Sequence, residues 1–196
     1  MNITSSKLIA VEGRDEKNFI EAFFKHLNIS NTQVLDVAGK DNFSLILPAI
    51  SKTPGFNSVV KFGIIRDADD SVENAFKSIL GALNKASLTQ PDSLSTFTDS
   101  TPSVGVYIMP DNTQKGMLED LCLSSVIDED NEKCLNEFFN CVDTNSIRNI
   151  SKAKVQAYLS TQPEVVSSVG LAAKKGYWNF TNPCFDDLKS FLLNFK

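Results

Sequence analysis

The chain has 196 residues, an apolar fraction of 42% and a net charge of −5, values typical of a folded globular protein and not of a disordered one. The length suits one sizeable core, or a core domain with a small extension. No run approaches the roughly 18 consecutive apolar residues that a membrane helix requires, so we expect no membrane span. The negative charge argues against a broad basic surface that grips nucleic acid, but not against an enzyme whose bound Mg²⁺ or Mn²⁺ neutralises clustered carboxylates.

The N-terminal segment and the cysteines favour a cytoplasmic protein. Residues 1–13 (MNITSSKLIAVEG) contain one lysine and a short apolar run that leads into a charged stretch, which predicts a first strand and not a signal peptide. The four cysteines form no C-x-x-C pair, and His26 is the only histidine. We therefore expect free thiols, and neither a zinc site nor a histidine-based hydrolase triad.

The first half of the chain alternates between strand and helix patterns. In chain order, the predicted elements are a strand at 7–12, a helix at 15–27, a strand at 33–37, a weaker helix at 43–50 that contains Pro48, a strand at 59–66, a helix at 72–85 and a strand at 104–109. The strands are rich in valine and isoleucine, and the helices carry apolar side chains at spacings of three and four. This alternation predicts an open parallel sheet covered by helices.

The second half of the chain is predicted to be helical. A stretch between residues 85 and 103, rich in serine, threonine, proline and aspartate, predicts a long mobile surface loop. After residue 117 the strand signal fades, and helices are predicted at 117–126, 131–142, 151–159, 165–173 and 183–195. We therefore predict an α/β domain at residues 1–127 and a helical extension at residues 128–196 packed on it.

Acidic side chains follow the predicted strands. Glu12 ends the first strand, where Gly13 is expected to permit a tight turn, and Asp67 and Asp69 follow the third. Ligands of open parallel sheets bind outside the carboxyl ends of the strands, and hard cations prefer oxygen ligands. Alternate residues of an extended D-x-D segment face the same way, so the two aspartates are predicted to share one metal ion. Glu12 is predicted to complete the cluster of ligands from the neighbouring strand. A single acidic pair is more often a helix cap or a solvated turn, but acids after successive strands favour a metal site.

These motifs resemble a known family. The segment VEGRDE at 11–16, followed by IIRDADD at 64–70, resembles the signature of Toprim domains, which occur in topoisomerases, bacterial primases and OLD-family nucleases. The resemblance covers roughly residues 7–126 and is closest to the OLD-like branch and to small stand-alone Toprim proteins. The segment at 39–43 resembles the glycine-rich turn after the second strand of OLD nucleases, and the segment at 116–121 resembles their later acidic element.

The resemblance implies a Toprim-like open sheet of about four parallel strands and assigns roles to named residues. Glu12 would be a metal ligand and an acid or base, and Asp67 and Asp69 would hold the metal ions, Mg²⁺ or Mn²⁺. OLD nucleases also use a lysine downstream of the acidic element to stabilise charge on the phosphate. Further candidates are Glu16 and Glu119 as ligands of a second ion, and Lys152 or Lys154 as the lysine, with Lys154 slightly preferred.

The sequence also departs from the relatives that the resemblance names. OLD nucleases carry an ATPase domain before the Toprim part, and this sequence has no G-x-x-x-x-G-K-[S/T] loop. No domain places a tyrosine nucleophile as in topoisomerases, and the zinc module of primases is absent. We therefore expect a possible ATPase partner protein.

The segment KKGYWNF has two readings. Tyr177 and Trp178 would stack on a base in a single-strand site, but such aromatics more often anchor a terminal helix. Lys174 and Lys175 would contact phosphate, although two adjacent lysines are usually only a solvated corner.

Three functions remain open from the sequence. The first is a metal-dependent nuclease that hydrolyses nucleic acid, DNA more than RNA, with a role in phage defence that rests on the resemblance. The second is a non-catalytic Toprim module that binds metal and nucleic acid or protein and needs a partner. The third, a small-molecule phosphotransferase, has no support beyond the sheet architecture.

Overall fold

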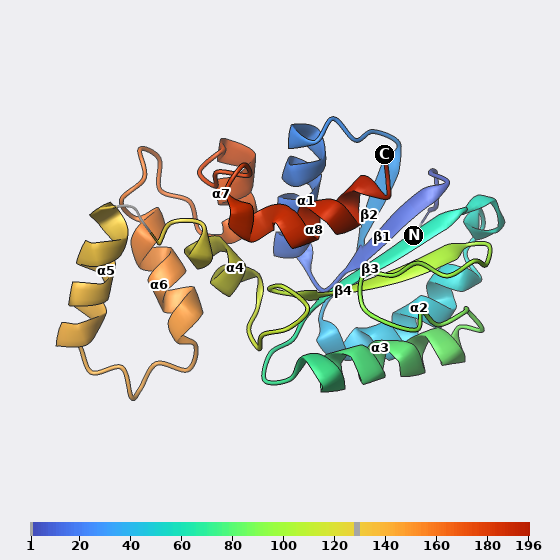
Figure 1. Cartoon of the computed structure of the whole chain (residues 1–196), viewed down its shortest axis with the longest axis horizontal. Helices are drawn as coiled ribbons and strands as arrows, with labels where there is room; N and C mark the ends of the chain where they lie inside the picture. The colour runs from blue at the N-terminus through green and yellow to red at the C-terminus, as the bar shows by residue number, and fades with distance from the viewer. Residues whose placement is uncertain (1, 128–129) are drawn as a thin grey trace.

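The structure, a computed structural model, describes residues 2–127 and 130–196. Its centre is a parallel sheet of four strands in the order β2-β1-β3-β4, as predicted from the sequence (Figure 1). Val11 lies opposite both Asp36 and Ile65, so the strands reach their carboxyl ends at the same edge of the sheet. The strands are β1 (Lys7–Val11), β2 (Thr32–Asp36), β3 (Lys61–Asp67) and β4 (Ser103–Met109).

Helices cover both faces of the sheet. Figure 1 shows α2 (Phe43–Ser51) and α3 (Val72–Lys85) below the sheet, and α1 (Arg14–His26) and α8 (Asp186–Leu193) above it. Three short 3-10 turns join these elements: η1 (Lys40–Asn42), η2 (Phe56–Ser58) and η3 (Pro183–Phe185). The predicted helix at 183–195 is therefore η3 followed by α8.

The strands bury both of their faces because apolar side chains alternate between two hydrophobic clusters. Along β1, Leu8 and Ala10 face α2 and α3, whereas Ile9 and Val11 face α1 and α8. A Cβ atom on Gly105 would lie 2.6 Å from the ring of Phe97, so this glycine makes room for an aromatic ring on the α8 side.

The segment between α3 and β4 lies against the outer edge of β4. The backbone N–H of Ser95 donates to Val106 O at 2.8 Å, and that of Thr98 donates to Val104 O at 3.0 Å. Phe97 stacks on Phe191 of α8, with ring centroids 5.2 Å apart. The sequence correctly predicted a loop, but the structure anchors it on the sheet edge instead of leaving it free at the surface.

The C-terminal helices extend the fold to one side and return along α1. They are α4 (Leu118–Ser124), α5 (Asp130–Cys141), α6 (Ile150–Leu159) and α7 (Val169–Lys175). In Figure 1, α5 and α6 project away from the sheet, whereas α7 lies beside α1. The predicted helix at 165–173 begins only at Val169, because Ser168 caps it by accepting a hydrogen bond from the N–H of Leu171.

Residues of α6, α7 and α8 share a hydrophobic cluster with α1 and the sheet. The predicted extension would begin at residue 128, which lies outside the described residues, so the division at 127 stays a prediction. Over the residues that are described, no helix is long and apolar enough to cross a membrane. Cys122, Cys134, Cys141 and Cys184 are free thiols.

Candidate functional site

The predicted acidic residues gather at the carboxyl edge of the sheet. Glu12 directly follows β1, Asp67 is the last residue of β3, Glu16 lies in the first turn of α1, and Glu119 lies in the first turn of α4. The backbone fixes the neighbouring turn, because the N–H of Gly39 after β2 donates to Glu12 O at 2.7 Å. The order of the strands places β1 beside β3, and therefore Glu12 beside Asp67.

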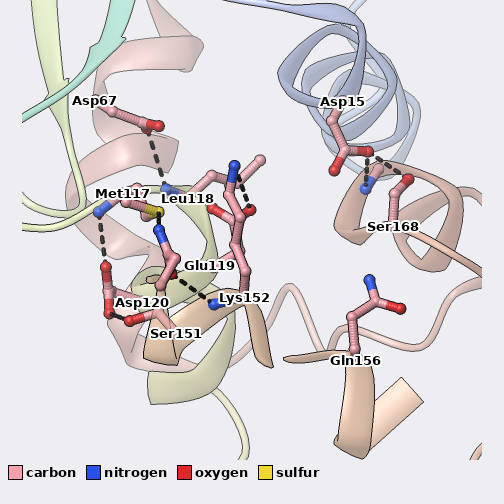
Figure 2. A network of polar contacts seen from close by, with 12 residues as sticks. Asp15, Asp67, Met117, Leu118, Glu119, Asp120, Ser151, Lys152, Gln156 and Ser168 are labelled. Carbon is pink, nitrogen blue, oxygen red and sulfur yellow. Dashed lines mark hydrogen bonds and ion pairs between the residues drawn. The ribbon is translucent and has the colours of Figure 1, made fainter. Parts of the chain in front are cut away.

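Asp67 is the most buried carboxylate of this group, with only 7% of its surface exposed. Burial raises the pKa of Asp67 well above its usual range, and the carboxylates of Glu16, Glu12 and Glu119 raise it further. Its Oδ1 atom accepts a hydrogen bond from the backbone N–H of Leu118 at 3.1 Å (Figure 2). This bond lowers the pKa, but it offsets only part of the rise.

Glu12 and Glu16 are also held in a setting that disfavours their charges. Burial raises the pKa of Glu12, and the carboxylate of Asp69 raises it further. Burial is likewise the largest cause that raises the pKa of Glu16 to about 7. Among the described residues, the buried Oε2 atom of Glu12 has no hydrogen-bond partner. The charges of Arg66 and Lys40 and the backbone N–H of Asp67 lower the pKa of Glu12, but they offset only part of the rise.

Gly13 gives Glu16 its position by having no side chain. A Cβ atom on Gly13 would lie 2.9 Å from Oε2 of Glu16. The backbone at Gly13 is extended, with φ −149°, and any residue can adopt that conformation. The chain does bend between β1 and α1 as expected, but the bend does not need the conformational freedom of glycine, and this glycine provides space instead.

Asp69 joins the group in a way that the D-x-D pattern did not predict. Its φ of +51° lies in the left-handed region, so the segment is not extended and the two aspartates do not simply alternate. The backbone N–H of Asp69 donates to Gly116 O at 2.9 Å, and that of Gly116 donates back at 2.8 Å. The side chain forms an ion pair with Lys40 at 2.9 Å, from the glycine-rich turn after β2.

Glu119, like Asp69, has a lysine beside it. It is 9% exposed, and burial raises its pKa, whereas the ammonium of Lys152, 3.7 Å away, lowers it. Lys154, the lysine slightly preferred from the sequence, lies elsewhere on the same helix. Its Nζ atom is 3.3 Å from Oδ1 of Asn136 and 6.0 Å from the ring centroid of Phe139, both on α5.

A hydrogen-bond network that the sequence analysis missed fixes α6 against α4. The carboxylate of Asp120 accepts from the N–H of Met117 at 2.8 Å and from Oγ of Ser151 at 2.5 Å (Figure 2). Ser151 precedes Lys152, so this network holds the lysine near Glu119. The adjacent residues Glu119 and Asp120 contact different partners, Lys152 and Ser151. Only the fold brings residue 151 close to residue 120.

A second missed contact closes the site on the α7 side. Oδ1 of Asp15 accepts from Oγ of Ser168 at 2.5 Å and from the N–H of Gly170 at 2.7 Å (Figure 2). Asp15, Glu119 and Lys152 line a small cavity of about 200 Å³ between α1, α6 and α7. The acidic edge therefore borders a recess that a ligand group can enter.

The donor set fits a divalent cation, although the side chains do not form a preorganised cage. Within residues 2–127 and 130–196, no three histidine, cysteine or acidic side chains are arranged closely enough to hold a metal ion. The fit rests on two observations: Glu12 has an orphaned buried oxygen, and the carboxylates of Glu12 and Glu119 raise the pKa values of both Asp67 and Glu16. A cation with oxygen preference would relieve both.

The fold is a Toprim-like α/β fold with an acidic carboxyl edge. The chain is similar to the solved "C-terminal region of the Burkholderia pseudomallei OLD protein", with 16% sequence identity and a TM-score of 0.52, over 99% of this chain and 100% of that one. The chain itself belongs to the family described as "Protein of unknown function (DUF3226)", whose model matches residues 6–195. None of the curated proteins matches. The resemblance to the OLD-like branch is thus confirmed for the fold.

Proposed function

We propose that this protein is a metal-dependent nuclease that uses Mg²⁺ or Mn²⁺ to hydrolyse phosphodiester bonds of nucleic acid, DNA more than RNA. One observation carries the proposal: buried carboxylates that repel one another meet at the carboxyl edge of a Toprim-like sheet, and one of them has an unpartnered oxygen. Such an edge is where open parallel sheets bind their ligands. Perturbed pKa values of this kind concentrate at functional sites.

The proposal gives each residue of the edge a task. Glu12, Asp67 and Asp69 would hold one metal ion, and Glu16 and Glu119 would supply oxygens to a second. When bound, such ions activate water and stabilise the leaving oxygen of a phosphodiester. Glu12 remains the candidate acid or base.

Of the two candidate lysines, the contacts favour Lys152. Its ammonium lies 3.7 Å from Glu119 and lines the cavity beside the acidic edge, whereas Lys154 contacts Asn136 and Phe139. Lys152 is therefore the residue that we propose to donate to a phosphate oxygen as negative charge builds on it.

A partner protein is the second part of the proposal. The solved relative is a C-terminal region of a longer protein, which supports a domain that works together with another unit. By resemblance to OLD nucleases, the partner would be an ATPase, and the biological setting would be phage defence.

A non-catalytic module that binds metal and nucleic acid or protein is the second candidate. The open spacing of the acidic side chains, none of which forms a three-residue metal cage in the described part of the chain, favours it. In that case a partner would have to complete the site, or no cleavage would occur at all.

The test is cleavage of supercoiled plasmid, linear duplex, single-stranded DNA and RNA with Mg²⁺ or Mn²⁺, by wild type and Asp67→Asn side by side. The proposal predicts cleavage by the wild type and none by the variant, with Glu12→Gln behaving like Asp67→Asn. Equal cleavage by all three proteins would refute the site. No cleavage by any of them, together with metal binding, would favour the binding module.

A further inference from the structure

A groove of about 910 Å³ lies beside the C-terminal ends of α1 and α7, and its rim is basic. Lys25 and His26 come from the last turn of α1, and Lys174 and Lys175 come from the last turn of α7. Within the described part of the chain, Glu21 is the only acidic residue that lines the groove. Three lysines therefore lie beside two carboxylates, those of Glu21 and Glu164, and this local excess of positive charge in a protein whose net charge is −5 suits an anionic ligand.

The ion pairs that the lysines already make are of a kind that phosphate can replace. Lys174 lies 3.3 Å from Glu21, and Lys175 lies 2.6 Å from Glu164. Both pairs are well exposed, and exposed pairs contribute little to stability. Lys25 has no salt bridge to any described residue, so its ammonium is available to a ligand.

Two of the aromatic residues that line the groove, Trp178 and Tyr177, differ in their surroundings. Trp178 is only 2% exposed, donates from Nε1 to Val169 O at 2.9 Å and stacks on Tyr158. This contact confirms the anchoring role that such residues usually have. Tyr177 is half-buried in the groove lining, with its hydroxyl donating to Glu164 O at 3.1 Å. Proteins bind single-stranded nucleic acid with this combination of side chains: the aromatic ring stacks on a base, and the lysines contact phosphates.

The line along which α1 and α7 pack against each other runs from this groove towards the acidic edge. At one end Asp15 lines the cavity beside Glu119 and bonds Gly170, and further along Asn18 accepts from Lys174 at 2.6 Å. From Asp15 to Lys25, α1 rises by about 15 Å at the rise of an α-helix. An extended single strand covers that distance with only a few nucleotides, because its phosphates lie further apart than those of a duplex.

We propose that the groove beside the C-terminal ends of α1 and α7 holds the single-stranded flank of a nucleic-acid substrate, a few nucleotides from the bond that the acidic edge cuts. This inference rests on the proposed function for the location of the cut. The lysines contact the phosphates, and Tyr177 packs against a base. The acidic edge is then supplied with a substrate that the chain's overall negative charge would otherwise repel.

The test measures binding apart from cleavage. Fluorescence anisotropy of a labelled single-stranded DNA oligonucleotide, titrated in EDTA, compares wild type with Lys25→Glu and Lys175→Glu. The matched control is Lys85→Glu, which changes the same charge in the last turn of α3, on the other face of the sheet. The inference predicts that each groove variant binds about tenfold more weakly, with a salt slope smaller by about 0.7, and that the control binds like the wild type.

Plasmid and oligonucleotide cleavage by the same proteins separates the two claims. If the groove variants bind as Lys85→Glu does, or if the wild type does not bind the oligonucleotide, the groove inference is wrong whether or not the wild type cleaves. If the groove variants lose binding but no protein cleaves, the groove stands as a nucleic-acid site and the proposed nuclease fails. Unchanged thermal unfolding of each variant excludes misfolding as the cause of lost binding.

Discussion

The backbone N–H of Leu118, the first residue of α4, donates to Oδ1 of Asp67, the last residue of β3, across 3.1 Å. This bond joins the sheet to the C-terminal helices at the most buried carboxylate of the acidic edge. This bond lowers the pKa of Asp67, whereas burial and the carboxylates of Glu16, Glu12 and Glu119 raise it. The geometry therefore tolerates a negative charge at Asp67 but leaves it short of a counter-charge.

The stability of the metal-free protein is expected to fall as the pH rises from about 4.5 to about 7. The pKa of Glu16 is raised from 4.5 to about 7 in the folded protein, mainly by burial. Between pH 4.5 and about pH 7 the folded state binds more protons than the unfolded state. The contribution of Glu16 to the free energy of unfolding is therefore complete below about pH 4.5 and is lost as the pH rises to about 7. Urea unfolding in EDTA across this window should show the decline, and Glu16→Gln should flatten it. A wild type that gains stability over this range would contradict the burial of Glu16.

Gly13→Ala is expected to weaken metal binding without weakening the fold. The new Cβ atom would lie 2.9 Å from Oε2 of Glu16, which is the flexible end of a side chain and can move away. The extended backbone at Gly13 accepts alanine, and its gain of about 0.4–1 kcal/mol through the unfolded state offsets the similar cost of alanine at the N-cap of α1. Unfolding and Mn²⁺ titration together measure both effects. Unchanged Mn²⁺ affinity would show that Glu16 takes no part in the site.

Lys152→Met should reduce cleavage by about 10²–10³-fold, because it removes a donor aimed at the phosphate. Lys154→Met is the matched control on the same helix, with its ammonium beside Asn136 and Phe139. We expect it to retain most of the activity. Single-turnover cleavage rates of the two variants decide between the lysines, and the reverse ranking would restore Lys154 as the catalytic lysine.

Gly170→Ala should destabilise the protein by about 1–3 kcal/mol, the usual cost of overpacking. Its Cβ atom would collide with the backbone oxygen of Asp15, which cannot move without separating α7 from α1. Gly81→Ala, in α3 with open space around it, is the control and should stabilise by about 0.5–1 kcal/mol. Equal stabilities of the two variants would refute the close packing of α1 on α7.

The sequence predicted the sheet and the acidic edge well because both depend on local patterns. Buried parallel strands appear as runs of valine and isoleucine, and polar residues at their ends necessarily meet at one edge. Glu12 and Asp67 were found in this way, and the resemblance supplied Glu16 and Glu119. The conformation of Asp69 was not predictable, since its left-handed backbone is set by the paired hydrogen bonds with Gly116.

The tasks of the C-terminal helices depend on long-range contacts that no local pattern contains. Ser151 and Lys152 look like ordinary residues of a polar helix start until Asp120 holds that helix against α4. The choice between Lys152 and Lys154 depends on this contact, because residues two apart on a helix point in different directions. In the same way, Ser168 ends up on Asp15 only after the chain returns along α1.

The most direct test of the metal site is thermal unfolding of wild type and Asp67→Asn over a series of Mn²⁺ concentrations. Asparagine keeps the oxygen that accepts from Leu118 and removes a buried charge that its neighbours repel. The metal-free variant should therefore be at least as stable as the wild type. Mn²⁺ should stabilise the wild type by about 2.7 kcal/mol at a hundred times its Kd, and the variant far less. Equal stabilisation of both proteins, or none of the wild type, would contradict a metal site at the acidic edge.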